Sequence, residues 1–171
     1  MKTFDITTKI YIFKVKELKD MKDTILSLIE SVEGLPFRDN CQSLSNTDWN
    51  LDNSHHRPYV DTVANAIIAE VNEGSPILPD ELYIKNMWFQ QYNADDFHDW
   101  HTHGDCMFSS VYYLELPDKT QTSFLIDGKE VQLDVEEGDF VVFPNCIPHC
   151  SKPNTTGERK TVIALNLNTV Y

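Results

Sequence analysis

The chain has 171 residues, a formal net charge of −13 at pH 7 and a sequence pI near 4.7. With 41% hydrophobic residues, it has the size of one ordinary globular domain and can bury a core. The negative charge repels phosphate groups and no basic patch interrupts it, so we expect neither a nucleic-acid partner nor an anionic membrane surface. No apolar run reaches the roughly 18 residues that span a bilayer, and the first residues do not resemble a signal peptide. We therefore expect a soluble, intracellular protein of the cytoplasm.

Two amphipathic helices are predicted in the first half of the chain. From 18 to 32 the apolar residues recur at steps of three and four, and Gly34 follows the segment. A second segment of the same kind begins near Pro58 and ends at Gly74. Both apolar stripes are typical of helices that pack on a core.

After about residue 80 the pattern changes to short apolar or alternating runs separated by turn residues. Six such runs without a helical pattern between them predict a mainly β fold, an antiparallel barrel or double-sheet jelly roll, with the helices on one outer face. We expect a single domain over 1–171, in which a helical or mixed segment (1–80) supports a jelly-roll core (81–171). The runs are YIKNMWFQQYN, FSSVYYLEL, SFLI, VQLDV, DFVVF and KTVIALNLN.

The stretch HDWHTHGD, residues 98–105, contains three of the six histidines of the chain. Residues two apart on an extended strand project to the same face, so His101 and His103 can point to one metal ion. His103 and Asp105 can do the same. The stretch therefore offers two overlapping ligand pairs, and spacing alone leaves both open.

A second histidine-bearing segment, EGDFVVFPNCIPHCSKPN, presents His149 after an apolar strand and a proline-rich turn. Ten residues later the sequence ERKTVIALNLN carries Arg159 and Thr161. A histidine pair, a distant histidine and an Arg-x-Thr motif occur together in one sequence much more rarely than each occurs alone. Cys146 and Cys150 flank His149 and raise a zinc interpretation, but their spacing matches no common zinc finger, so we expect reduced thiols.

Because it carries these histidine and arginine segments in this order, the sequence from about Trp88 to Asn168 resembles the iron- and 2-oxoglutarate-dependent oxygenases. It is most similar to a group of small oxygenases of bacteria and phages related to prolyl hydroxylases, which carry segments like HTHGDCMFSSVYYLELP, EGDFVVFPNCIPH and ERKTVIALN. The resemblance implies a double-stranded β-helix that binds Fe(II) and 2-oxoglutarate and uses O2 to hydroxylate a second substrate. It covers about half of the chain.

The resemblance also implies roles for individual residues. His101, His103 and His149 would be the metal ligands. Arg159 would bind the distal carboxylate of 2-oxoglutarate, because a guanidinium pairs well with a carboxylate. Thr161, Tyr92 and Tyr113 would contact the same carboxylate.

The sequence departs from the usual pattern at position 103, where most of the superfamily has a carboxylate. Three imidazoles leave the site one negative charge poorer, which would weaken iron binding or shift its potential. If His103 and Asp105 are the pair instead, the usual triad of two histidines and one carboxylate is restored with His149. We favour His101, His103 and His149, on the alignment to SSVYYL.

Two other functions share this barrel. A metal-binding cupin that does not use 2-oxoglutarate has a similar second motif, but its first motif normally adds a glutamate where this chain has Cys106 to Phe108. A catalytically silent protein could keep the histidines as a folding metal site. The substrate is not readable, because the loops expected to contact it (41–57, 93–100 and 117–122) carry no recognisable motif. Kinship with prolyl hydroxylases alone suggests a peptidyl proline or another protein side chain, and fold is a weak guide to substrate.

Overall fold

Antiparallel strands dominate the second half of the chain, as the alternating apolar runs predict. The computed structural model describes residues 7–52, 54–74, 82–118 and 120–169. Three helices and the strands follow one another along the chain in this order: β1 (Tyr11–Lys14), α1 (Lys16–Asp20), α2 (Lys22–Glu30), β2 (Leu35–Arg38), β3 (Gln42–Thr47), α3 (Tyr59–Gly74), β4 (Leu82–Tyr92), β5 (Phe97–His101), β6 (Phe108–Glu115), β7 (Ser123–Ile126), β8 (Lys129–Gln132), β9 (Asp139–Pro144), β10 (His149–Ser151) and β11 (Lys160–Thr169).

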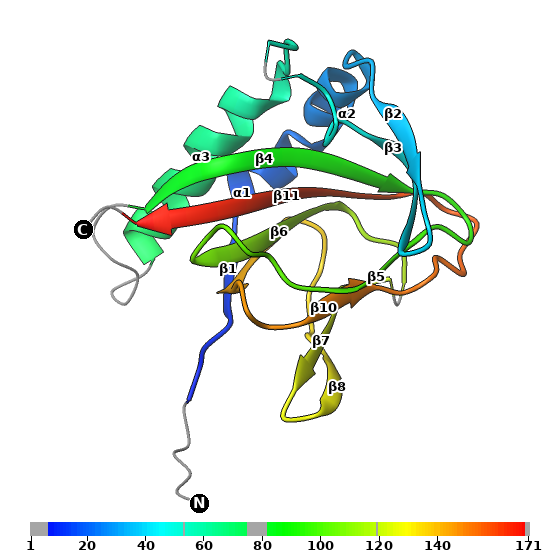
Figure 1. Ribbon diagram of the computed structural model, residues 1–171. Coiled ribbons are helices and arrows are strands. Elements are labelled where there is room, and N and C mark those ends of the chain that lie inside the picture. The colour runs from blue at the N-terminus through cyan, green and yellow to red at the C-terminus, as the bar shows by residue number, and fades with distance from the viewer. Residues whose placement is uncertain (1–6, 53, 75–81, 119, 170–171) are drawn as a thin grey trace, which may run out of the picture.

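The strands form one antiparallel sheet that curls on itself. Its order is β1-β9-β6-β11-β4-β3-β5-β10-β7-β8, and β2 pairs with β3 off this path. The long strands β4, β11 and β6 form the upper layer in Figure 1, and β5 and β10 lie below them. The mainly β fold is confirmed, and this curled sheet has the architecture of a double-stranded β-helix.

The first half of the chain contributes strands as well as helices. β1 pairs with β9, and β3 connects β4 to β5, so the N-terminal segment completes the sheet at two places. The first expected helix is divided at Met21 into α1 and α2, while α3 spans Tyr59–Gly74 and thus lies within the second expected segment. No helix among the described residues has both the length and the apolar character needed to cross a membrane.

The helices cover the outer face of the long strands, as predicted (Figure 1). An outer core joins helix residues such as Ile25 and Ile67 to Phe89 and Ile163 of the sheet. An inner core lies inside the curl, around residues such as Phe124 and Val162 of the facing strands. Strand β11 is therefore buried on both faces.

A buried carboxylate fastens the segment after β3 to this scaffold. Asp48 is fully buried and accepts hydrogen bonds from the Phe89 N–H (2.8 Å) and the Tyr59 hydroxyl (2.6 Å). Arg57 Nε lies 3.1 Å from Oδ2, the oxygen that also accepts from Tyr59. Burial raises the pKa of the Asp48 carboxyl despite these partners. The contacts fix the end of β3 and the start of α3 against β4, next to Trp88.

Candidate metal centre

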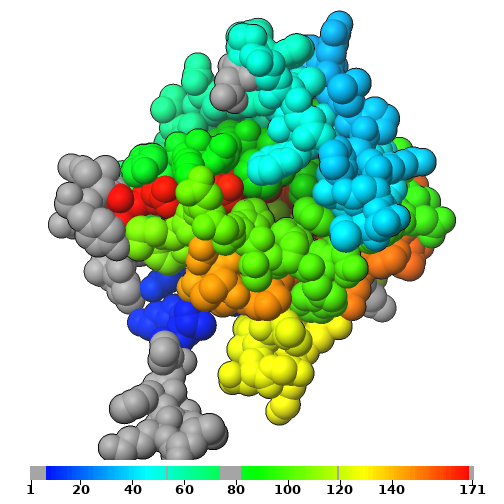
Figure 2. Space-filling model, viewed as in Figure 1, coloured from blue at the N-terminus to red at the C-terminus, as the bar shows by residue number. Residues whose placement is uncertain are grey.

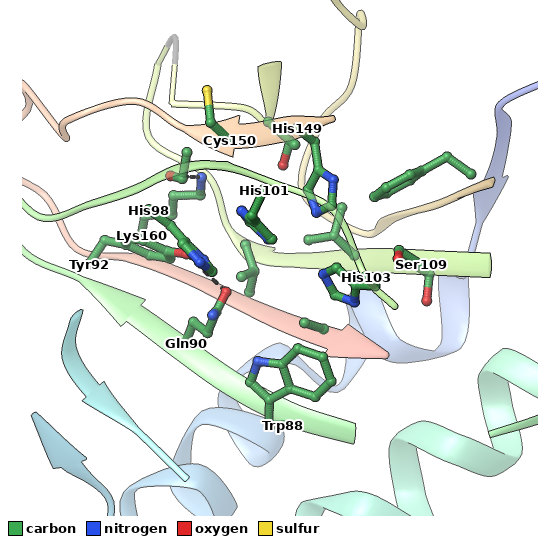
Figure 3. A pocket seen from close by; sticks show the side chains of 17 residues that line it. Trp88, Gln90, Tyr92, His98, His101, His103, Ser109, His149, Cys150 and Lys160 are labelled. Atoms are coloured by element: carbon green, nitrogen blue, oxygen red, sulfur yellow. Dashed lines mark hydrogen bonds between the residues drawn. The ribbon is translucent and has the colours of Figure 1, made fainter. Parts of the chain in front are cut away.

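Three histidines from two distant segments meet inside the curl of the sheet. His149 begins β10 and lies directly opposite His101, the last residue of β5, in the antiparallel register. His103 follows two residues after the end of β5. One ring nitrogen of each histidine lies within 4.8 Å of those of the other two, so the three can hold one metal ion (Figure 3).

In each of these three rings, one nitrogen is hydrogen-bonded to a carbonyl oxygen. A carbonyl oxygen only accepts hydrogen bonds, so Nδ1 carries the proton and Nε2 keeps its lone pair for a metal. The acceptors fix each ring in one tautomer and one orientation. The distances from Nδ1 are 2.8 Å for His101 to Asp99 O, 2.6 Å for His103 to Asn166 Oδ1, and 3.0 Å for His149 to Ile147 O.

The surroundings also keep the three imidazoles neutral. Burial is the largest cause that lowers the pKa of His101 and of His103. Burial, reinforced by the neighbouring His101, lowers the pKa of His149 to about 3. Metal binding requires the neutral imidazole, so the site is in its ligating state at neutral pH.

The loop that carries His103 is held by the turn between β9 and β10. The His103 N–H donates to Asn145 O (3.2 Å), and Asn145 Nδ2 donates to His103 O (3.0 Å). Asp105 lies outside the cluster: its side chain is 93% exposed and forms an ion pair with Lys85. The structure thus brings together the pair in HTH and leaves the carboxylate of HGD in solvent.

His98 is a fourth histidine beside the cluster. Its ring stacks on that of His101, with 3.8 Å between centroids and 11° between planes. Burial lowers the pKa of His98 to about 3. Its ring lies on the wall shared by the two hollows described next.

A cavity of about 50 Å³ extends from the histidines into the barrel. None of the described residues that line it is acidic. Its deep end is formed by Lys160, Tyr92 and Ser151, and Figure 3 shows Lys160 and Tyr92 beyond His98 as seen from the three ligating rings. The cavity therefore has a metal-binding group at one end and a cation at the other.

Lys160 is an ammonium group buried without a carboxylate. Its side chain is 1% exposed, and Nζ donates to Thr120 O (2.5 Å) and Ser151 Oγ (2.9 Å). Nζ also lies 5.0 Å from the centroid of the Tyr92 ring. Among the described residues, no acidic group lies within ion-pairing distance of it. Burial lowers the pKa of Lys160 to about 7.

Arg159, which the resemblance assigns to this role, does not reach the cavity. Its guanidinium makes two hydrogen bonds to Glu115 (2.8 and 3.1 Å) and lies 3.5 Å from Glu30 of α2. Thr161 points to the same side and donates to Glu115. Arg159 directly precedes β11, and the next residue, Lys160, is the one whose side chain lines the cavity.

The two tyrosines occupy different positions. Tyr92 lines the cavity, and its hydroxyl donates to Gln90 Oε1 (2.9 Å). Tyr113 packs in the inner core, where its hydroxyl accepts a hydrogen bond from the Thr122 N–H (3.2 Å). Tyr92 can therefore contact a ligand in the cavity, whereas Tyr113 is not among the residues that line it.

A wider cleft of about 320 Å³ adjoins the cavity on the solvent side. Both hollows share Trp88, Gln90 and the rings of His98, His101 and His103. The outer wall of this cleft is formed by β2, β3 and the segment after β3. β3 pairs with β5, and in Figure 2 the blue to cyan atoms of this wall lie against green atoms. Its apolar side chains are Phe37, Leu44, Trp49 and Trp88. Two of the loops expected to contact a substrate, 41–57 and 93–100, thus contribute to this cleft.

Three residues of the site were not singled out by the sequence. Lys160, Gln90 and Asn166 all lie on β4 or β11 with their side chains toward the hollows. The only available signal was the alternation along β11, which places Lys160 and Asn166 on one face together with Val162 and Ala164.

The fold matches solved structures of 2-oxoglutarate- and iron(II)-dependent oxygenases. A prolyl-4-hydroxylase from Pseudomonas putida has 18% identity and a TM-score of 0.67 over 96% of this chain and 95% of that chain. HygX from Streptomyces hygroscopicus, with nickel and 2-oxoglutarate bound, has 10% identity and a TM-score of 0.70 over 96% and 84% of the two chains. A Trichoplax adhaerens prolyl hydroxylase in complex with a peptide fragment has 13% identity and a TM-score of 0.63 over 94% and 83%.

These likenesses concern the fold, since the sequences have diverged widely. No family model matches the sequence, and comparison with curated proteins found no significant match. The chain has the double-stranded β-helix of the 2-oxoglutarate- and iron(II)-dependent oxygenases, with three histidines grouped at the place where its cavity opens.

Proposed function

We propose that the chain is an Fe(II)- and 2-oxoglutarate-dependent dioxygenase. It couples the oxidative decarboxylation of 2-oxoglutarate, which yields succinate and CO2, to the hydroxylation of a second substrate. The observation that carries this proposal is the pairing of Lys160 with the three histidines across one cavity. A buried cation without a counter-ion costs free energy unless a ligand provides the negative charge.

A dicarboxylate fits both ends of this cavity. Its distal carboxylate can accept hydrogen bonds from Lys160 Nζ and sit near the Tyr92 hydroxyl, while its keto acid end faces the histidines. Because no acidic residue among those described lines the cavity, nothing there repels a dianion. HygX binds 2-oxoglutarate within the same fold, which supports this assignment.

The donor set suits iron. Imidazole nitrogens bind Fe, Zn, Cu and Ni, and the three Nε2 atoms leave further positions on a six-coordinate ion for other ligands. A ferrous ion bound here would supply the activation of O2 and the one-electron chemistry of the reaction. The histidines hold it through Nε2, and the apolar walls of the inner core keep bulk water away.

The outer cleft is the place for the second substrate. It adjoins the three histidines and offers an aromatic wall with a few polar groups, the usual character of a small-molecule or peptide site. Gln90 belongs to both hollows, so it can contact the co-substrate and the substrate. Solved structures of this fold include a peptide complex and a complex of HygX with hygromycin B, so peptides and small molecules are both candidate substrates.

Anaerobic calorimetry with Mn(II) tests the proposal. We expect 2-oxoglutarate to bind the Mn(II)-loaded protein and not the metal-free protein. Lys160→Met removes the cation with little change in shape, and we expect it to weaken binding about 30-fold or more, since loss of one partner of a buried charge pair costs about 2–5 kcal/mol.

Arg159→Met is the matched control, because Arg159 directly precedes Lys160 but its side chain binds Glu115 and does not line the cavity. We expect it to bind 2-oxoglutarate within about twofold of the wild type. The reverse result, with loss of binding in Arg159→Met alone, would restore the assignment made from sequence. Metal uptake without any response to 2-oxoglutarate would point to a cupin-type protein instead.

A further inference from the structure

The three ligating histidines differ in what holds them. His101 and His149 donate to main-chain carbonyls only two residues away, which any sequence provides. His103 donates to a side chain 63 positions away, Asn166 of β11. This partner is therefore the only one of the three that a single substitution can change.

Asn166 is buried beside the ring of His103. It lies on the cavity side of β11, is 8% exposed, and its Oδ1 is 2.6 Å from Nδ1 of His103. The buried thiol of Cys106 lies 3.5 Å from the same oxygen and can donate a second hydrogen bond to it. The ring of Trp88 stacks on the other side of His103, with 6.1 Å between centroids.

The loop geometry explains why His103 needs such a partner. His101 and His149 are locked in paired strands, whereas His103 lies beyond the end of β5. The hydrogen bonds of Asn145 fix the main chain at His103 but leave its side-chain torsions free. Without an acceptor at Nδ1, the ring could rotate or exchange its tautomer, and Nε2 would no longer face the other two ligands.

We propose that Asn166 is a positioning residue of the metal centre, which holds His103 in the ligating tautomer and orientation. The inference rests on the metal-binding part of the proposed function and not on 2-oxoglutarate. The choice of an amide also affects the ligand strength of His103. A carboxylate acceptor at Nδ1 would make this imidazole more basic, whereas the neutral amide of Asn166 does not.

Three variants separate this role from simple stability. Asn166→Leu keeps the size but has no acceptor, and Asn166→Asp keeps the acceptor. Asn168→Leu is the control, because Asn168 lies two residues along the same strand and its Oδ1 accepts a hydrogen bond from the main chain of Met107 (2.8 Å), not from a histidine.

The measurements are metal affinity, by titration with Mn(II) and Co(II), and proton NMR of the Co(II)-loaded protein in water. We expect Asn166→Leu to bind about 10- to 100-fold more weakly, Asn166→Asp to bind at least as tightly as the wild type, and Asn168→Leu to bind within about twofold. The wild type should show three exchangeable, hyperfine-shifted Nδ1 protons, and Asn166→Leu should lose one of them.

Two results would overturn the inference. One is an affinity of Asn166→Leu within about twofold of the wild type, and the other is a weaker affinity with all three proton signals retained, since that indicates general destabilisation. A wild type that binds no metal would refute the proposed function itself, so the two failures can be told apart.

Discussion

The affinity for 2-oxoglutarate should depend on pH through Lys160. The ammonium form attracts the distal carboxylate, whereas the neutral amine does not. Burial lowers the pKa of Lys160 from 10.5 to about 7, so above that pH the free protein has lost the proton that the complex needs. Binding must then take up a proton before the charge pair can form.

The magnitude follows from this pKa. Below about pH 7 the affinity should be nearly constant, and above it the affinity should fall toward tenfold per pH unit, close to 100-fold between pH 6 and pH 9. Proton uptake on binding should rise over the same range from near zero to about one. The carboxylates of 2-oxoglutarate are ionised throughout, so they do not contribute.

Anaerobic calorimetry of the Mn(II)-loaded protein in two buffers of different ionisation enthalpy measures both quantities. Lys160→Arg is the matched variant, because a guanidinium stays charged over this range and should give a flat profile. An affinity that does not change from pH 6 to pH 9, without proton uptake, would show that Lys160 is not the group that receives the carboxylate.

Two further predictions concern the ligand set and the scaffold. Asp105→Ala should leave Mn(II) affinity within about twofold of the wild type, because its side chain is 93% exposed and paired with Lys85, whereas His149→Ala should abolish uptake; equal losses in the two variants would reinstate the carboxylate ligand. Asp48→Ala should lower the free energy of unfolding in urea by about 3–5 kcal/mol, because it leaves Arg57 and the Phe89 N–H without their buried partner. A loss below about 1 kcal/mol would mean that Asp48 does not fasten β3 to β4.

The long strands were predictable because their pattern is local. YIKNMWFQQYN corresponds to β4 and KTVIALNLN to β11, and each observed strand differs from its run by one or two residues at most. The strands that carry metal ligands are not among the six apolar runs. β5 has five residues and β10 has three, so each is short. Polar residues (histidine, aspartate and serine) occupy most of their positions, so no alternation of apolar and polar residues marks them as strands. Their pairing is set by contacts across the sheet, which the sequence does not display.

The convergence of the histidines was predictable, and their tautomers were not. The spacing in HTH and the strand before His149 indicated one shared metal ion, and the three rings do meet in the fold. The acceptors at Nδ1 depend on the path of the loop after β5 and on Asn166, which lies 63 positions from His103. A motif can therefore name the ligands without naming the groups that orient them.

The choice between Arg159 and Lys160 shows where a local pattern fails on a strand buried from both sides. Along β11, residues 160–167 are all buried, so hydrophobic alternation does not tell the helix side from the cavity side. Arg159 and Lys160 then look equivalent, and the choice depends on long-range partners. Glu115 neutralises the guanidinium on one side, while nothing acidic in the described part of the chain neutralises the ammonium on the other. A buried lysine without an acidic partner either loses its proton or binds an anionic ligand, and the proposed function rests on the second alternative, which only the pairing seen in the fold brings into view.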